Sequence, residues 1–445
     1  MNFVLHPSFK LLFSILCFGL ILTACSTTYI PTSHKAPASH VVTVDLQEGD
    51  TETSIQEQYG GDILVWGDDF AVLSLHSDDA LHLQSELTST FWGRARVERN
   101  KATFFATGEV GMNGSGLWAN GSGLWANGSG LWAGGSGLWA SGDDVWADSE
   151  FIMMPQNTSS WLQIGLDQAH DLAPHLGYGV KVAIIDSGLD LSHPAFVNSL
   201  APQNEWLDLV DDDNYPQEEG FLGEGAYGHG TAVAGIVRQV APSATILPIR
   251  VLDETGAGYL EDLIEAVNWA RKKGADVINM SLGSPDYSYA VDQVIGDAAL
   301  NGHLMVSSAG NMSSYHIVFP AMQASDWSTG FNRLSVTSVD RNDIRSSFAS
   351  IGWSVELAAP GEYIYGPAPD MRMASWSGTS MAAPVASGAI ALALAEQLKV
   401  DRDKVLQQLE NTAENIYHIS SNGNFRNALG KGRIDIENFL TQTIR

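Results

Sequence analysis

The chain has 445 residues, which is enough for two or three domains with ordinary hydrophobic cores, and 44% of its residues are hydrophobic. Its 23 Lys and Arg face 51 Asp and Glu, so the formal charge is -28, which excludes simple electrostatic binding to nucleic acid or to anionic lipid. The only two cysteines, Cys17 and Cys25, exclude a disulfide framework and a cysteine-built zinc site.

The N-terminus has the features of an export signal. Lys10 precedes the apolar run LLFSILCFGLILTA, which is too short for a membrane span but has signal-peptide proportions. The run ends in LTAC, which resembles a bacterial lipobox. We therefore predict that residues 1–24 are removed, that Cys25 receives lipid and anchors the protein to the cell envelope, and that residues 25–40 form a polar tether. The alternative is an ordinary secretory signal with an incidental cysteine, and both alternatives predict export.

Residues 41–99 predict a small domain of alternating strands and helices. The apolar runs VVTVDL, DILVW, FAVLSL and GRARVERN predict four strands, and helices are expected from Thr51 to Tyr59 and from Ser77 through Leu87. The order βαββαβ is that of a ferredoxin-like unit. This pattern by itself indicates no function.

Residues 113–147 form an internal repeat with a period of seven. The unit NGSGLWA occurs three times and is followed by GGSGLWA and SGDDVWA. Glycine and asparagine in every unit cost too much helix propensity for a helical heptad, so short Leu-Trp pieces joined by Asn-Gly turns are expected. Two interpretations stay open: a flexible linker over 112–149, or a strip of five evenly spaced indoles that docks on a partner, a glycan or a neighbouring domain.

From residue 150 to 445 the pattern predicts one α/β domain. Short runs rich in Val, Ile and Leu are typical of parallel strands buried on both faces; they are VKVAII, ATILPIRV, DVINMSL, HLMVSSA and RLSVTSV. Helices are expected between them, one from Leu260 to Gly274 and one around Val291 and Ile295. In such a domain the chemistry lies in the loops at the carboxyl ends of the strands.

Three of those loops hold an acid, a base and a nucleophile, in that order. Asp186 ends a buried strand, His229 lies between two glycines at the start of a small-residue helix, and Ser380 starts a long apolar helix. A serine hydroxyl needs an imidazole to take its proton and a carboxylate to orient that imidazole. The helix N-terminus also aims backbone N–H groups at a developing oxyanion.

At these residues the chain resembles the subtilisin-like serine proteases, whose triad runs Asp, His, Ser. The resemblance covers nearly all of 160–440, through IDSG at 185–188, GHGTAVAGI at 228–236, SAGN at 308–311 and SGTSMAAP at 377–384. It implies that Asp186 orients the imidazole, that His229 is the general base, and that Ser380 is the nucleophile. One departure is Ala232, where many relatives have histidine.

The same resemblance implies further roles in substrate binding. Asn311 would be the side-chain donor of the oxyanion hole. The stretch around NMSLG at 279–283 would pair with the substrate backbone, and SSAG at 307–310 would form the opposite wall of the main specificity pocket. The substrate-binding residues so implied are Ser281, Leu282, Gly283, Ser308, Ala309 and Gly310.

The N-terminal unit acquires a role from the resemblance too. Many subtilisin-like enzymes carry a βαββαβ propeptide whose C-terminal tail occupies the cleft, so residues 41–111 would be a propeptide and intramolecular inhibitor with NKATFFATGEVG at 100–111 as its tail. An independent accessory domain is the alternative.

The acidic stretch WLDLVDDDN at 206–214 suits a hard cation but lacks EF-hand spacing, so a solvated acidic loop is favoured. No cofactor is required, and a structural calcium stays open because some members of the family bind it.

Together these features predict an exported, lipid-anchored serine endopeptidase that acts on proteins or peptides. The fold class is α/β, with a subtilisin-like catalytic domain built on a central parallel sheet and preceded by a small ferredoxin-like propeptide domain. A protein of another class, an inactive surface lipoprotein that binds a ligand through the tryptophan repeat, is the alternative.

Overall fold

The computed structural model describes residues 37–76, 91–106, 155–221, 225–325, 332–396 and 400–444. Cys25, the helix predicted from Ser77 and the tryptophan repeat lie outside the described residues, as does the end of the predicted propeptide tail. Among the described residues, no helix is both long and apolar enough to cross a membrane.

The C-terminal region is built on a seven-stranded sheet in the order β15-β14-β13-β11-β7-β9-β8, and every pair in it is parallel. This confirms the predicted fold class and the five predicted strands. The strands are β7 (Lys181–Asp186), β8 (Leu207–Asp208), β9 (Thr245–Arg250), β11 (Val277–Met280), β13 (Leu304–Ser308), β14 (Arg333–Val339) and β15 (Leu357–Pro360).

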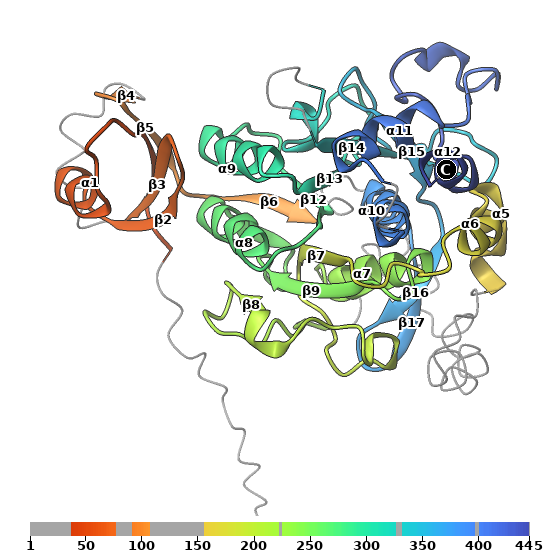
Figure 1. The fold of residues 1–445 in the computed structure, drawn as a ribbon, viewed down its shortest axis with the longest axis horizontal. Coiled ribbons are helices and arrows are strands. Elements are labelled where there is room, and N and C mark those ends of the chain that lie inside the picture. The colour runs from red at the N-terminus through yellow and green to blue at the C-terminus, as the bar shows by residue number, and fades with distance from the viewer. Residues whose placement is uncertain are drawn as a thin grey trace, which may run out of the picture. The chain divides into compact units, whose positions relative to one another are not determined.

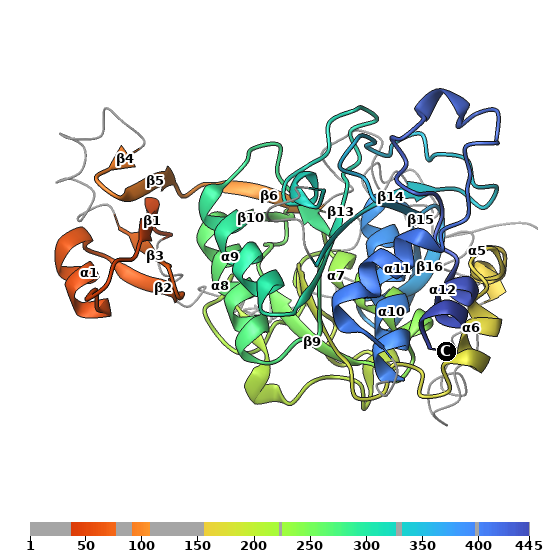
Figure 2. The same ribbon diagram turned by 45° about the horizontal axis from the view of Figure 1, so that its top comes forward.

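Helices cover both faces of the sheet, as Figures 1 and 2 show. Because side chains alternate along a strand, Val182 and Ile184 of β7 belong to one core cluster and Ala183 and Ile185 to the other. The first cluster includes α7 (His229–Val240) and α10 (Thr379–Ala395), and the second includes α8 (Leu260–Lys272) and α9 (Tyr289–Leu300).

The two predicted helices between strands have clear local causes. In α8, Glu261 and Asp262 lie in the first turn and Arg271 and Lys272 in the last, an arrangement that the helix dipole favours. In α9, the Ser288 side chain accepts a hydrogen bond from the Val291 N–H and caps the helix.

Smaller elements surround this core. The helices are α5 (Thr158–Gln163), α6 (Leu166–Leu172), α11 (Val405–Asn411) and α12 (Ile436–Thr443). The strands are β10 (Ala257–Tyr259), β12 (Leu282–Gly283), β16 (Ile364–Ala368) and β17 (Arg372–Trp376).

The N-terminal region, residues 37–106, contains an antiparallel sheet in the order β2-β3-β1-β5-β4. Its elements are β1 (His40–Asp45), α1 (Glu52–Tyr59), β2 (Asp62–Trp66), β3 (Phe70–Leu75), β4 (Phe91–Trp92), β5 (Ala95–Arg99) and β6 (Ala102–Ala106). The four predicted strands and the first predicted helix are confirmed. Thr51 and Ser54 form a capping box at the start of that helix.

Candidate active site

Asp186 and His229 form a buried pair. The Asp186 Oδ1 atom lies 2.7 Å from Nδ1 of His229, and the two side chains are 1% and 2% exposed. Asp186 is the last residue of β7, and His229 is the first residue of α7. The carboxyl end of a central strand therefore supplies the acid, and the start of a helix supplies the imidazole that the acid orients.

Ser380 is the second residue of α10 and is held against the strand stretch around Ser281. Its hydroxyl donates to the Ser281 carbonyl at 3.2 Å, and the Ser281 hydroxyl donates to the Ser380 carbonyl at 2.9 Å. Trp376, at the end of β17, lies edge-on to the His229 ring, with ring centroids 5.9 Å apart. These contacts bring the serine turn, residues 377–380, to the side of the sheet that carries the Asp186-His229 pair.

Asn311 is tied to the same turn. Its Oδ1 accepts the Thr379 N–H at 2.9 Å, which is the first N–H of α10, and the Thr379 hydroxyl accepts the Gly310 N–H at 3.0 Å. Using the amide oxygen in this way turns the NH2 group of Asn311 away from Thr379. The side chain is 5% exposed, so a buried amide donor is placed beside the nucleophile's helix.

The residues predicted to pair with substrate hold a strand of the chain itself. In a three-stranded antiparallel sheet, β6 lies between β12 and β10. Leu282 pairs with Ala106 and Gly283 with Phe105, while Ala257 and Gly258 pair from the other side. Figure 1 shows β6, in orange, reaching β12. This site therefore binds an extended backbone from both edges.

Ser308 ends β13, and Ala309 and Gly310 follow it. A short floor segment, Val318 and Phe319, is hydrogen-bonded to Ala309 on one side and to Ser284, the residue after β12, on the other. Ser284 exchanges two backbone hydrogen bonds with Phe319, of 2.9 and 2.8 Å, and the Val318 N–H donates to Ala309 at 3.0 Å. A Cβ placed on Gly310 would lie 2.8 Å from Cγ1 of Val318. The isopropyl group of Val318 therefore occupies the space beside Gly310.

Sequence reasoning missed several residues of this site. The strand β10 was not predicted, although its Gly258 lies so close to the Val251 carbonyl that a Cβ would come within 2.5 Å of that oxygen. Glu218 was not predicted either, and it is 3% exposed and lies among the residues that start α7. No local pattern distinguishes Glu218 from the adjacent Glu219, whose side chain is 47% exposed.

The acidic stretch 206–214 corrects the expectation of a solvated loop. Asp208 is 1% exposed, and its carboxylate lies 3.0 Å from Nη1 of Arg250, which also lies 2.5 Å from Asp211. Burial raises the pKa of Asp208 to about 6, although Arg250 favours its charged form. Among the described residues, no group of three or more His, Cys, Asp or Glu side chains is placed to hold a metal ion.

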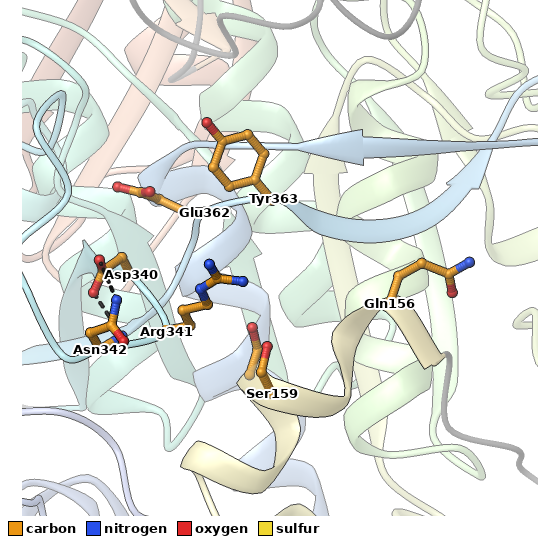
Figure 3. Close-up of a pocket in the computed structure, with 8 residues that line it drawn as sticks. Gln156, Ser159, Asp340, Arg341, Asn342, Glu362 and Tyr363 are labelled. Carbon is orange, nitrogen blue, oxygen red and sulfur yellow. Dashed lines mark hydrogen bonds between the residues drawn. The ribbon is translucent and has the colours of Figure 1, made fainter. Parts of the chain in front are cut away.

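A separate cavity of about 350 Å³ lies between the start of α5 and the segments at 340–342 and 362–363 (Figure 3). Its wall includes Arg341, Glu362 and Tyr363, none of them predicted site residues. The Tyr363 N–H donates to the Ser377 hydroxyl at 2.9 Å, and this hydrogen bond links the cavity wall to the serine turn. Asp186, His229, Ser380 and Asn311 do not line this cavity.

The subtilase family matches residues 177–432, more than half of the chain. The chain belongs to the subtilase family. This subtilase is 35% identical over 283 residues to thermitase from Thermoactinomyces vulgaris, covering 61% of this chain and 92% of thermitase. It is 35% identical over 253 residues to subtilisin DY from Bacillus licheniformis, covering 54% of this chain and 85% of that relative.

A solved structure titled as proteases from Pseudoalteromonas arctica shares the fold of this subtilase. The TM-score is 0.55 at 24% identity, covering 65% of this chain and 98% of that one. With the family match, these findings identify a subtilisin-like serine endopeptidase on an α/β fold, whose substrates are proteins or peptides.

Proposed function

We propose that this subtilase hydrolyses peptide bonds through Asp186, His229 and Ser380. The observation that carries the proposal is the buried 2.7 Å contact between Asp186 Oδ1 and His229 Nδ1, which holds Nδ1 protonated and leaves Nε2 to act as base. The Ser380 hydroxyl adds to the scissile carbonyl as its proton passes to His229. His229 then protonates the leaving amine, and water hydrolyses the acyl-enzyme by the reverse route.

The oxyanion of the tetrahedral intermediate would be held by Asn311 and by backbone N–H groups at the start of α10. The bond from Thr379 N–H to Asn311 Oδ1 supports this role, because it orients the amide before substrate arrives. Charge that develops on the substrate oxygen then meets a donor that needs no reorientation. Side chains, backbone N–H groups and water supply all of this chemistry, so no cofactor is required.

Substrate would bind as an extended strand between β12 and β10, with Ser281, Leu282 and Gly283 on one side and Ser308, Ala309 and Gly310 as the facing wall. The pairing of β6 with both strands supports this, since any peptide backbone can make the same bonds. Val318 at the floor favours a small side chain before the scissile bond, because its isopropyl group lies against Gly310.

Residues 41–111 would act as a propeptide that inhibits the enzyme until it is cut. Three contacts support this: β6 occupies the substrate strand site, Glu98 accepts the Tyr289 and Ala290 N–H groups at the start of α9, and Glu261 accepts the Ala38 N–H at 2.8 Å. The last residue of β6, Ala106, pairs with Leu282, the residue after Ser281, which favours a first cut shortly after Ala106. A second candidate for the cut is the glycine-rich repeat at 113–147, whose Leu-Trp pairs resemble the apolar side chains that such clefts accept.

Lipidation of Cys25 would anchor the precursor to the cell envelope, and cleavage would release the protease. The lipobox-like LTAC supports the anchor. An epitope tag in the tether 25–40 and another after Arg445 can be followed through membrane and soluble fractions. The C-terminal tag should become soluble in the wild type and stay membrane-bound in Ser380→Ala; a full-length, active, membrane-held wild type would contradict release.

The triad is tested by labelling with a fluorophosphonate probe, which reacts only with an activated serine. The wild type should be labelled, Ser380→Ala should not, and Ser347→Ala, which removes an exposed hydroxyl, should be labelled like the wild type. Absence of labelling in the processed wild type would favour the alternative of an inactive lipoprotein.

A further inference from the structure

Glu218 is a buried carboxylate that accepts hydrogen bonds from three residues near the Asp-His pair. Its Oε1 accepts from the Ser187 hydroxyl at 2.6 Å and from the Gly228 N–H at 2.8 Å. Its Oε2 accepts from the Thr231 N–H at 3.0 Å and also from the Thr231 hydroxyl. A carboxylate that is 3% exposed and satisfied by four donors holds those donors in fixed places.

The helix that carries His229 lacks a local cap. Its N-cap residue is Gly228, at φ 95°, which has no side chain to accept the orphan N–H groups of the first turn. The His229 N–H donates to the Ala226 carbonyl, the Gly230 N–H to the Ser187 hydroxyl, and the Thr231 N–H to Glu218. Glu218 and Ser187 thus accept the hydrogen bonds that the side chain of an N-cap residue would otherwise accept. The negative charge of Glu218 also interacts favourably with the dipole of the helix N-terminus.

The same carboxylate is linked to Asp186 through Ser187. The Ser187 N–H donates to Asp186 Oδ1 at 2.8 Å, the oxygen that also contacts His229. Ser187 is therefore held at its backbone by Asp186 and at its hydroxyl by Glu218. One side chain thereby joins the loop after β7 to the start of α7, the two elements whose relative position sets the distance between Asp186 and His229.

Burying this charge is costly, which argues that the arrangement is retained for a purpose. Burial raises the pKa of Glu218 to about 7, with the nearby Asp186 charge adding to the effect and the bonds from Ser187 and Thr231 opposing it. A neutral side chain of similar size would fill the same space at less cost. It would not accept all four hydrogen bonds.

We propose that Glu218 is a positioning residue that holds Asp186 and His229 in catalytic alignment, acting through Ser187 and the first turn of α7. This rests on the triad under the proposed function. In this role Glu218 contacts neither the substrate nor Ser380. Its effect falls on kcat, because it sets the alignment of the base and not the binding of the peptide.

The test compares Glu218→Gln with Glu219→Gln in enzyme that is expressed as the full chain and allowed to process. The amide keeps the shape but replaces one acceptor oxygen by a donor, so the contacts of one oxygen, either those with Thr231 or those with Ser187 and Gly228, are lost. We expect kcat to fall on the order of 10- to 100-fold with KM within about twofold, the scale of a small misplacement of a catalytic group. Glu219→Gln makes the same chemical change at a half-exposed neighbour and should leave kcat within about twofold.

A second readout separates positioning from general stability. The His229 Nδ1 proton, which points at Asp186, gives a low-field proton NMR signal that should shift or broaden in Glu218→Gln and stay in place in Glu219→Gln. An unmoved signal together with unchanged kcat would overturn the proposal, and so would a rise in KM alone.

If Glu218→Gln does not fold, Ser187→Ala tests the same path by removing a single hydroxyl, and an unchanged kcat in that variant would overturn the proposal. If both variants fold, the double variant should have a kcat only slightly below that of the less active single variant. Full additivity of the two losses in kcat would contradict one shared path. The fluorophosphonate probe should still label Ser380 in each variant, more slowly. Absence of labelling in the wild type would instead contradict the triad itself.

Discussion

The C-terminal and N-terminal regions solve the burial of a β-sheet in different ways. The parallel sheet at 181–360 is covered on both faces by helices of the same region, which form two core clusters. The antiparallel sheet at 40–99 covers one face with α1, around Val42, Val44 and Ile55. On its other face, Val41 and Val72 belong to the cluster that contains α8 and α9 of the C-terminal region.

This difference suggests a division of labour. The C-terminal region contains its own core and all of the predicted catalytic side chains. The N-terminal region buries one face of its sheet against helices of the C-terminal region, as expected for a small unit with few core residues. Such an N-terminal region would lose part of its core on leaving the enzyme, which agrees with the proposal that it is a propeptide that binds first and is later removed.

The largest expected effect tests whether the chemistry belongs to the C-terminal region alone. Ser380→Ala, His229→Ala and Asp186→Ala should each remove most turnover, by roughly 10⁴- to 10⁶-fold in kcat, and combined changes should add little because the three act as one unit. Hydrolysis of casein measures this, with each inactive variant first processed in trans by an added protease that is then removed. Activity of Ser380→Ala above background would move the chemistry elsewhere.

The next effect concerns the oxyanion hole. Asn311→Ala should lower kcat on the order of 10²- to 10³-fold with KM little changed, a magnitude known from subtilisin itself, because only the transition state carries the oxyanion. Steady-state kinetics on one peptide measures both constants. Asn332→Ala, which removes a buried amide from the start of β14, is a control for general loss of stability. An effect on KM alone would place Asn311 in ground-state binding.

A third effect sharpens the account of the cleft. Val318→Gly should enlarge the pocket and raise kcat/KM for Phe relative to Ala before the scissile bond, on the order of 10-fold. Paired peptides that differ only at that residue measure the ratio. Val197→Gly, at a 60% exposed position, should leave it unchanged. An unchanged ratio in Val318→Gly would remove Val318 from the pocket floor.

A smaller effect tests how the N-terminal region is held. Glu98→Gln removes a charge from the start of α9 and should weaken the hold by about 0.3–1 kcal/mol, so that amides of β10 and β12 exchange with solvent about two- to fivefold faster. Hydrogen exchange on the uncleaved Ser380→Ala chain measures this. Glu57→Gln, exposed on α1, is the matched control. Equal exchange in both variants would mean that Glu98 contributes nothing to the contact.

The smallest effect is a pH dependence of stability within the C-terminal region. Glu218 in the folded chain keeps its proton up to about pH 7, whereas a glutamate in the unfolded chain releases it near pH 4.5. The folded state therefore binds more protons in this window, and stability falls as pH rises through it. The Tm of Ser380→Ala should decline from pH 5 to pH 8, and adding Glu218→Gln should flatten the decline. Parallel Tm curves would contradict the raised pKa.

The sequence by itself determined most elements and the identity of the catalytic candidates. Buried parallel strands read as continuous apolar runs, and Asp186, His229, Asn311 and Ser380 stand in short motifs whose residue types have few other uses together. The helix start at Thr51 was also predicted, because its capping hydrogen bond reaches only three residues along the chain.

Only the tertiary structure decided which charged groups are buried and what lies in the cleft. Glu218 and Glu219 are adjacent and identical in type, yet one closes the start of α7 and the other is half-exposed beside Arg250. The burial of Asp208 and the addition of β6 between β10 and β12 likewise depend on contacts across 42 residues or more. Burial and long-range strand pairing arise from the packing of distant segments, so no local pattern encodes them.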